Sequence, residues 1–228
     1  MRYIIATIKP WNINFLKENK KKFPGNVFFI FDPKKLNIKN INKINPEKIF
    51  FIHWSKTIKS EIYINYNCIL FHMTDLPYGR GGSPLQNLIL KKKKVTKITA
   101  LNVTKNIDSG DIYLKRNLIL NGSAEQIFLR SIKIIFKMII FILKKKIKPI
   151  KQKKSTIIFK RLTEKQNEIK FNQLNNIYDI HDRIRMVDAE TYPKAYYNFK
   201  NFMLKFTNSV LKGKRIIANV AIYEKKKL

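Results

Sequence analysis

The chain has 228 residues, 45% of them hydrophobic and 12% aromatic, which suffices for the core of one α/β domain with an appendage. Its formal charge of +32 favours an anionic partner, yet only eight of the 47 basic residues are arginine and the lysines occur in scattered runs. A solvated lysine surface and a positive field that helps to bind an anionic ligand are both open. The single cysteine excludes a disulfide within the chain and fits a cytoplasmic location.

No signal peptide is expected, because Met1 is followed directly by an apolar strand. The most apolar helical segment, residues 124–143, is interrupted by Arg130, Lys133 and Lys137, so we predict no membrane span. The three histidines and the cysteine are isolated from one another in sequence and predict no metal site.

Short apolar runs rich in β-branched and aromatic residues alternate with helical segments along the chain. The predicted strands are residues 3–8, 27–31, 49–54, 67–71, 95–103 and 111–120. The predicted helices are residues 12–22, a short turn after the third strand and residues 84–92, while residues 32–47 have no clear assignment. This alternation predicts a Rossmann-like α/β fold, in which a mostly parallel sheet carries helices on both faces.

The stretch Ser123-Ala124-Glu125-Gln126 has the form of a capping box and predicts the start of a long helix. Five apolar residues recur on one face of this helix at helical spacing: Phe128, Ile132, Ile135, Ile139 and Ile142. We expect this face to cover the sheet rather than to lie on a membrane.

A lysine-rich stretch that ends at residue 154 predicts a domain boundary. We therefore expect a main domain over residues 1–150 and a small C-terminal extension over residues 151–228. Within the extension, residues 174–187 predict a helix, and residues 196–206 and 215–223 predict a β-hairpin.

The loop that follows the fourth strand has the densest set of turn-forming residues in the chain. Eight consecutive positions contain Pro77, Gly79, Gly81, Gly82 and Pro84. His72 stands at the end of the preceding strand, and Ser83-Pro84-Leu85-Gln86 has the form of a second capping box. Ligands bind outside the carboxyl ends of the strands in open α/β sheets, so the sequence predicts a site here.

The same loop carries a family resemblance. His72, Pro77, Arg80-Gly81, Pro84 and Gln86, followed by Asp108-Ser109-Gly110-Asp111, resemble the N10-formyltetrahydrofolate-dependent formyltransferases. The pattern of that family is roughly N-x-H-x-S-x-L-P-x-x-R-G-x-x-P-x-Q, with D-x-G-D later. The resemblance covers residues 1–145, and more weakly residues 155–223. It implies an N-formyltransferase of the formyltransferase fold that uses N10-formyltetrahydrofolate as co-substrate.

The resemblance implies that His72 and Asp108 are catalytic. His72 would act as general base and then as general acid, because the pKa of an ordinary histidine lies near neutrality, and Asp108 would orient it. The implied folate-binding residues are Phe71, Thr74, Asp75, Leu76, Pro77, Gly81, Asn106 and Ile107. The implied residues for the acceptor substrate are Arg80, Gln86 and Tyr192.

Two positions depart from the family pattern. Leu70 stands where the family has an asparagine that helps to hold the oxyanion, and Asp75 stands where a leucine is usual. We take Asn87 and Thr74 as candidate replacement donors, with Asn67, loop N–H groups and protonated His72 also open. His53 follows the third strand, and either lines the folate pocket or is packed in the core.

We expect the acceptor to be a small-molecule amino sugar, nucleotide-linked or sialic-acid-like, in surface-glycan biosynthesis. Residues 155–223 are too few for the barrel that tRNA formyltransferases append, and the loop Met73 to Leu76 is similar to formyltransferases of glycan pathways. The alternative is methionyl-tRNA formyltransferase, which the positive charge favours. A further alternative is a non-catalytic or hydrolytic relative, because of Leu70. An oligomer is compatible with the sequence.

Overall fold

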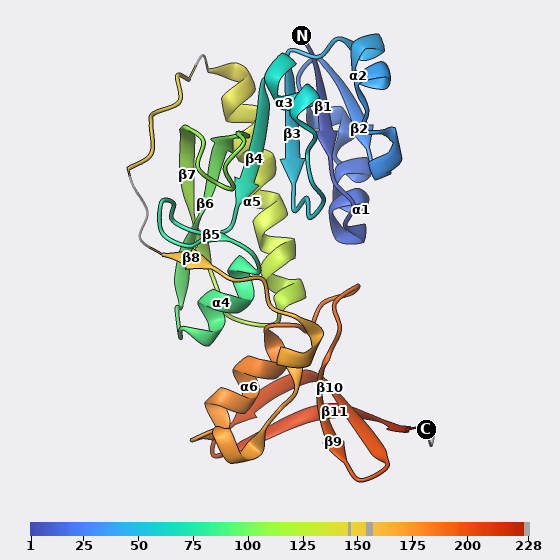
Figure 1. Cartoon of the computed structure of the whole chain (residues 1–228), viewed down its shortest axis with the longest axis vertical. Helices are drawn as coiled ribbons and strands as arrows, with labels where there is room; N and C mark the ends of the chain where they lie inside the picture. Colours follow the sequence, from blue (N-terminus) through green and yellow to red (C-terminus); the bar gives the residue numbers. More distant parts are fainter. Residues whose placement is uncertain (146, 154–156, 226–228) are drawn as a thin grey trace.

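The computed structural model describes residues 1–145, 147–153 and 157–225 (Figure 1). Its main element is a six-stranded sheet in the order β2-β1-β3-β4-β6-β7. The strands are β1 (Arg2–Ala6), β2 (Asn26–Ile30), β3 (Lys48–Ile52), β4 (Cys68–His72), β6 (Val95–Asn102) and β7 (Ile112–Ile119). The first four strands are parallel, whereas β6 runs antiparallel to both β4 and β7. The predicted Rossmann-like, mostly parallel α/β fold is confirmed.

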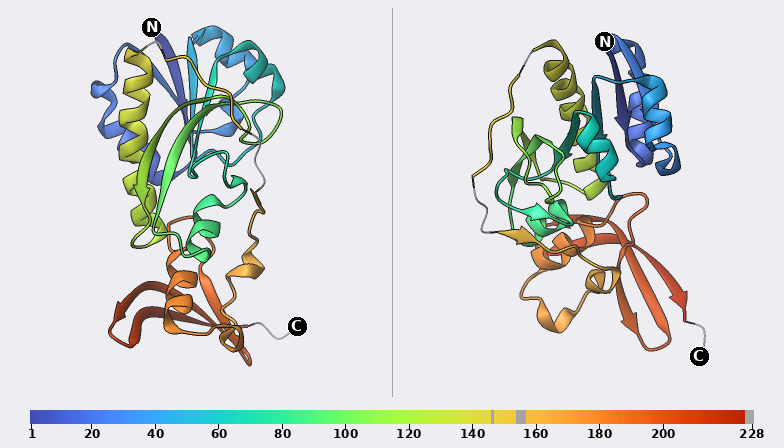
Figure 2. Two further views of the ribbon diagram at one scale, coloured as in Figure 1. Left: turned by 90° about the vertical axis from the view of Figure 1, so that its left-hand side faces the viewer. Right: turned by 45° about the horizontal axis from the view of Figure 1, so that its top comes forward.

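Helices cover both faces of this sheet, as expected (Figure 2). These helices are α1 (Pro10–Glu18), α2 (Ile38–Ile44), α3 (Ser60–Asn65) and α5 (Ala124–Lys144). Because side chains alternate along a strand, neighbouring residues of β3 enter different cores. Phe50 packs in the larger core with α1 and α5, and Phe51 packs in the smaller core with α2 and α3. Burial on both faces explains the continuous apolar runs of the parallel strands.

The segment without a sequence assignment, residues 32–47, forms a 3-10 turn, Pro33–Lys35, followed by α2. The side chain of Asn37 caps α2 by accepting a hydrogen bond from Asn40 N, and Asn45 ends the helix with a positive φ of 47°. Asparagine at both ends therefore defines a helix that has little apolar periodicity. The first predicted helix begins earlier than expected, at Pro10, and ends at Glu18 before a 3-10 turn, Lys20–Lys22.

Helix α5 matches its sequence prediction. Ser123 accepts a hydrogen bond from Gln126 N, and the Gln126 side chain accepts one from Ser123 N, which completes the capping box. The five predicted apolar residues are all buried, from 0% to 4% exposed. No helix within the described residues is long and apolar enough to cross a membrane.

The second capping box is not formed, and that prediction is wrong. Helix α4 (Pro84–Leu90) follows Ser83, which has a φ of 48° rather than the extended conformation of a capping residue. The hydroxyl of Ser83 accepts a hydrogen bond from Leu162 N at 3.0 Å, and the side chain of Gln86 donates to Met186 O at 3.1 Å. Later parts of the chain therefore take both side chains that a local cap would have used.

The chain returns to the site loop after α5. Residue Ile150 forms a bridge with Ile112, and the short strand β8 (Ile158–Phe159) pairs in parallel with β5 (Arg80–Gly81). The predicted boundary falls in this returning segment, and the residue that ends its lysine run, Lys154, lies outside the described residues. The division of the chain at residue 150 stays a prediction.

The C-terminal part is a three-stranded antiparallel sheet, in the order β11-β10-β9, with helix α6 packed against it (Figure 1). Its elements are two 3-10 turns (Glu164–Asn167 and Phe171–Gln173), α6 (Ile177–Arg185), β9 (Ala195–Phe199), β10 (Phe202–Lys212) and β11 (Arg215–Glu224). The predicted hairpin is correct for β10 and β11. The prediction of one strand over residues 196–206 is wrong, because the chain turns at Lys200, where φ is 48°.

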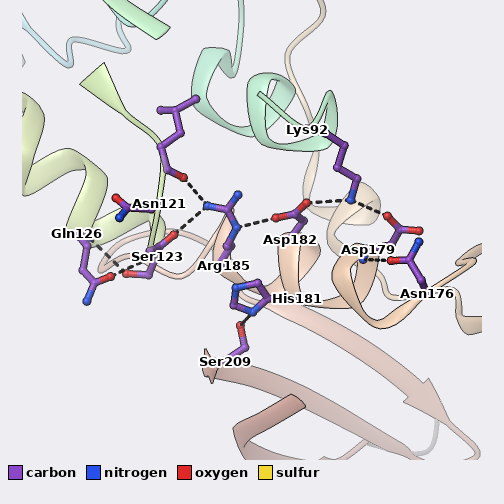
Figure 3. A network of polar contacts seen from close by, with 12 residues as sticks. Lys92, Asn121, Ser123, Gln126, Asn176, Asp179, His181, Asp182, Arg185 and Ser209 are labelled. Atoms are coloured by element: carbon purple, nitrogen blue, oxygen red, sulfur yellow. Dashed lines mark hydrogen bonds and ion pairs between the residues drawn. The ribbon is translucent and has the colours of Figure 1, made fainter. Parts of the chain in front are cut away.

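A polar network joins α6 to the main unit (Figure 3). Asp182 lies between two cations: it pairs with Lys92, just after α4, at 2.8 Å and with Arg185 at 2.6 Å. Arg185 also donates to the carbonyl oxygens of Leu120 and Gly122, at 2.7 and 3.0 Å, beyond the end of β7. The side chains of Asp182 and Arg185 are 12% and 13% exposed, so these contacts form largely out of water.

His53 is a packed histidine at the end of β3. Its Nδ1 accepts hydrogen bonds from Trp11 Nε1 at 3.4 Å and Asn12 Nδ2 at 3.1 Å, so the ring proton sits on Nε2, which donates to Ser131 Oγ at 3.0 Å. Burial, together with the charge of Lys9, lowers the pKa of His53 to about 3. Of the two open interpretations, the structure favours the packed residue over a folate contact.

The substitution Arg185→Met should lower the free energy of unfolding by about 2–4 kcal/mol, because it leaves two carbonyl oxygens and one partner of a buried ion pair unsatisfied. Urea unfolding followed by circular dichroism measures the loss. The matched control is Arg183→Met on the same helix, because Arg183 has an exposed hydrogen bond to Gln166 O and no part in the network of Asp182. A loss for Arg185→Met no larger than that of the control would contradict this role.

Stability should fall as the pH drops below about 6.5, because unfolded His53 then takes up a proton that the folded protein excludes until about pH 3. The expected loss from this residue between pH 7 and pH 5 is about 2 kcal/mol. In His53→Asn, where asparagine tolerates the φ of 46°, this part of the pH dependence should disappear. Equal pH slopes for the two proteins in urea unfolding would refute the assignment.

Candidate active site

The two predicted catalytic side chains lie together. His72 ends β4, and Asp108 lies in the loop between β6 and β7; because β6 pairs with β4, the two segments are neighbours. The distance from His72 Nδ1 to Asp108 Oδ2 is 3.4 Å, and the side chains are 7% and 6% exposed. The same carboxylate oxygen accepts a hydrogen bond from Gly81 N at 2.9 Å. Their catalytic roles stay predictions.

The second ring nitrogen of His72 also meets an acceptor. His72 Nε2 lies 2.9 Å from Gly79 O, which is buried beside it. Because one neighbour of the ring is a carbonyl oxygen and the other a carboxylate, both contacts form as hydrogen bonds at once only when the ring carries two protons. Oxygen atoms of the glycine-rich loop and of the Asp108 loop therefore lie against both ring nitrogens of His72.

The glycine-rich loop comes close to the backbone of β8. Gly81 has a φ of 104°, and a Cβ at this position would lie 2.4 Å from Phe159 O. Gly82 N donates to the same oxygen at 2.9 Å. Glycine at position 81 is thus required both by the backbone conformation and by the approach of β8.

The predicted folate loop is held by two lysines. Asp75 pairs with Lys97 at 2.9 Å and with Lys115 at 2.5 Å, and Lys115 also donates to Leu76 O. Burial alone would raise the pKa of Asp75, but the hydrogen bonds and charges of the two lysines outweigh it and lower that pKa. The unusual carboxylate at position 75 therefore ties the loop to β6 and β7.

Two of the candidate oxyanion donors, Asn87 and Thr74, already donate hydrogen bonds to backbone carbonyl oxygens. The Asn87 amide nitrogen lies 3.0–3.1 Å from the carbonyl oxygens of residues 82, 83 and 160. The Thr74 hydroxyl donates to Gly79 O at 3.3 Å. The more remote candidate Asn67 accepts a hydrogen bond from Tyr113 at 3.2 Å. Leu70, at the position of the family's asparagine, packs against the smaller core.

The remaining predicted folate contacts are of two kinds. The side chain of Phe71 stacks on Phe50 in the larger core, so the strand backbone is the part of this residue that can face a ligand. Asn106 is exposed, and its carbonyl accepts hydrogen bonds from Thr104 and Ser109. Ile107 is 74% exposed beside Asp108, and Pro77 is half-buried in the loop after β4.

The predicted acceptor residues do not form one cluster by direct contact. Gln86 is buried and donates to Met186 O, at the end of α6. Tyr192 stacks on Phe128, and burial raises its pKa against the opposing effects of the Arg161 charge and a hydrogen bond with Gln86. Gln86 and Tyr192 thus lie together, where the main unit meets the C-terminal part.

Arg80 instead contacts a residue that sequence reasoning missed. Its Nε and Nη2 donate to Gln152 Oε1 at 3.3 and 2.9 Å, and Nη2 also donates to Lys153 O at 3.2 Å. Gln152 lies in a lysine-rich stretch without periodicity, so no local signal marked it. Within the described residues, no group of three or more histidine, cysteine or acidic side chains is placed to hold a metal ion.

Comparison with known proteins gives a consistent family. A profile described as "Methionyl-tRNA formyltransferase, C-terminal domain" matches residues 164–223. The methionyl-tRNA formyltransferase of Clostridium botulinum is 28% identical over 189 residues, which are 77% of this chain and 60% of that protein. That of Rickettsia massiliae is 26% identical over 186 residues, with the same coverage. The chain thus matches about 60% of the length of these curated relatives.

A solved structure is similar over nearly the whole chain. The methionyl-tRNA formyltransferase from Clostridium thermocellum has a TM-score of 0.92 and 46% identity, covering 98% of this chain and 99% of that one. A sugar N-formyltransferase from a Shewanella species has a TM-score of 0.67 and covers 93% of this chain and 99% of that one. Its identity is only 17%, so it shares the fold and says nothing about the acceptor.

The expectation of an amino-sugar acceptor in a glycan pathway is wrong. It relied on residues 155–223 being too few for the C-terminal part of a tRNA formyltransferase, yet the profile of that part matches residues 164–223. The solved structure at 46% identity and the two curated relatives are all named methionyl-tRNA formyltransferase, which was the alternative acceptor assignment. The predicted family resemblance is confirmed: this chain belongs to the formyltransferase family that includes the methionyl-tRNA formyltransferases.

Proposed function

We propose that this protein transfers a formyl group from N10-formyltetrahydrofolate to the amino group of methionyl-tRNA. The observation that carries the proposal is a buried His72–Asp108 pair in a chain that is 46% identical to a methionyl-tRNA formyltransferase over nearly its whole length. Formyl transfer between nitrogens needs proton transfers and charge stabilisation but no redox chemistry, and this pair fits that need. A cytoplasmic location, where charged tRNA is found, agrees with the proposal.

His72 moves the proton in this proposal. As the new carbon–nitrogen bond forms, His72 takes a proton from the attacking amine; as the old bond to N10 breaks, it returns that proton to the leaving nitrogen. The negative charge of Asp108 stabilises the ring while it holds two protons. Gly81 N, which donates to the Asp108 carboxylate, keeps that carboxylate in place.

Protonated His72 also serves as the oxyanion donor. The side chain of Leu70 has no hydrogen-bond donor, and those of Asn87 and Thr74 already donate to backbone carbonyl oxygens. Removal of one oxyanion donor costs about 3–4 kcal/mol where it has been tested, so the absence of the asparagine predicts a slow enzyme. The ring would leave Gly79 O to make this contact when the substrates bind.

The acceptor tRNA is supported by charge as well as by the relatives. With a net charge of +32, the protein attracts a polyanion electrostatically. Binding through lysine–phosphate contacts releases counterions, so the affinity for tRNA should fall steeply with salt. A small amino-acid substrate lacks this dependence.

Purified protein mixed with N10-formyltetrahydrofolate and methionyl-tRNA should yield formylmethionyl-tRNA, detected by acid gel electrophoresis, with release of tetrahydrofolate. Raising the salt from 50 to 200 mM should increase KM for the tRNA by at least about tenfold. Free methionine is the control acceptor and should remain unmodified. Folate release without formylated tRNA would instead mean hydrolysis and would refute the proposal.

His72→Ala and Asp108→Asn should each lower kcat by about 10²–10⁴-fold, because each removes part of the proton-transfer pair. Their fold should persist, as judged by circular dichroism and thermal unfolding. His181→Ala is the matched control, because that histidine contacts Ser209 in the C-terminal part and should leave kcat within about twofold. Full activity in either variant of the pair would contradict the mechanism.

A further inference from the structure

Gln152 uses every hydrogen-bonding position of its side chain within the site. Its Oε1 accepts two hydrogen bonds from Arg80, and its Nε2 donates to the carbonyl oxygens of Asp108 and Gly110, at 3.0 and 2.6 Å. Only this orientation of the amide satisfies both sides, because guanidinium groups donate and carbonyl oxygens accept. The arrangement is thus defined by chemistry as well as by position.

These four hydrogen bonds connect the glycine-rich loop of Arg80 to the loop of Asp108. Arg80 lies in the glycine-rich loop whose residue 81 donates to the Asp108 carboxylate. Asp108 itself has a φ of 50°, in the left-handed region that few non-glycine residues adopt and that aspartate tolerates better than most. Gln152 binds the carbonyl groups on both sides of Ser109. It therefore fixes the backbone of Asp108 and, with it, the direction of the Asp108 side chain.

We propose that Gln152 is a positioning residue, which holds the loop of Asp108 so that its carboxylate faces His72. The proposal deepens the proposed formyl transfer and rests on it for its effect on rate. The hydrogen bonds of Gln152 go to Arg80 and to the two backbone carbonyl oxygens, so it acts through the backbone of the Asp108 loop.

The residue type itself supports this role. A glutamate could pair with Arg80 but could not donate to the two carbonyl oxygens, and a lysine could donate to the carbonyls but would repel Arg80. The two halves of the contact can therefore be separated by substitution. Gln152→Glu keeps the acceptor for Arg80, removes the donor that holds the Asp108 loop and places a negative charge beside the two carbonyl oxygens, whereas the neutral Gln152→Met removes both halves.

The test uses Gln152→Glu, the neutral Gln152→Met, and Gln173→Met as a control, because Gln173 is an exposed glutamine of the C-terminal part. With methionyl-tRNA and N10-formyltetrahydrofolate, both variants of Gln152 should lower kcat by about tenfold and change KM for tRNA less than twofold. The control should match the wild-type protein. Unchanged kcat in Gln152→Glu would overturn the proposal.

A second readout does not require activity. In protein labelled at histidine Cε1, the Cε1–H signals of His53, His72 and His181 are assigned by substituting each histidine. Both variants of Gln152 should shift the His72 signal at pH 7 and leave the other two in place. A shift without any wild-type formyl transfer would retain the positioning role and reject the proposed function. A fall in kcat with an unmoved His72 signal would reject the positioning role.

Discussion

The candidate active site depends on the close approach of backbone from three distant parts of the chain. Gly81 N must reach the Asp108 carboxylate, and Gly82 N must reach Phe159 O, both at 2.9 Å. A side chain at residue 81 would collide with that last carbonyl. The glycines therefore allow β8 to dock on β5, and this docking sets the loop that faces His72. The placement of Asp108 beside His72 is thus a product of backbone packing more than of the two side chains themselves.

This dependence explains what the sequence could and could not predict. His72 was found because a strand end followed by glycines and prolines is a local signal, and Asp108 because it stands at a family spacing. Gln152 gave no signal, since a glutamine among lysines has no periodicity and its partners lie more than 40 residues away. Ser83 was misassigned for the same reason: a residue beyond the local sequence, Leu162, took its hydroxyl. Local rules describe elements well and the contacts between elements poorly.

The C-terminal part shows a related limit, with a functional consequence. The turn at Lys200 lacks glycine and proline. The sequence pattern therefore predicts one strand where the structure has β9 and β10, and a simple hairpin where it has three strands. A three-stranded sheet with α6 is a larger structure, and its network through Asp182 and Arg185 joins it to α4 and to the end of β7. The expectation of a small acceptor depended on taking residues 155–223 as a simple hairpin. The profile that matches this part instead agrees with the proposed tRNA acceptor.

The distribution of charge connects the fold to that acceptor. The chain has only 15 acidic residues, and several of them stand at joints: Asp75 beside two lysines, Asp108 at His72, and Asp182 between Lys92 and Arg185. Because 15 acidic residues face 47 basic ones, most of the lysines have no carboxylate to neutralise them. The largely buried His72–Asp108 and Asp182–Arg185 pairs are screened little by salt, whereas the field of the exposed lysines extends only about one Debye length. Salt should therefore weaken the attraction of a polyanion long before it loosens the active site.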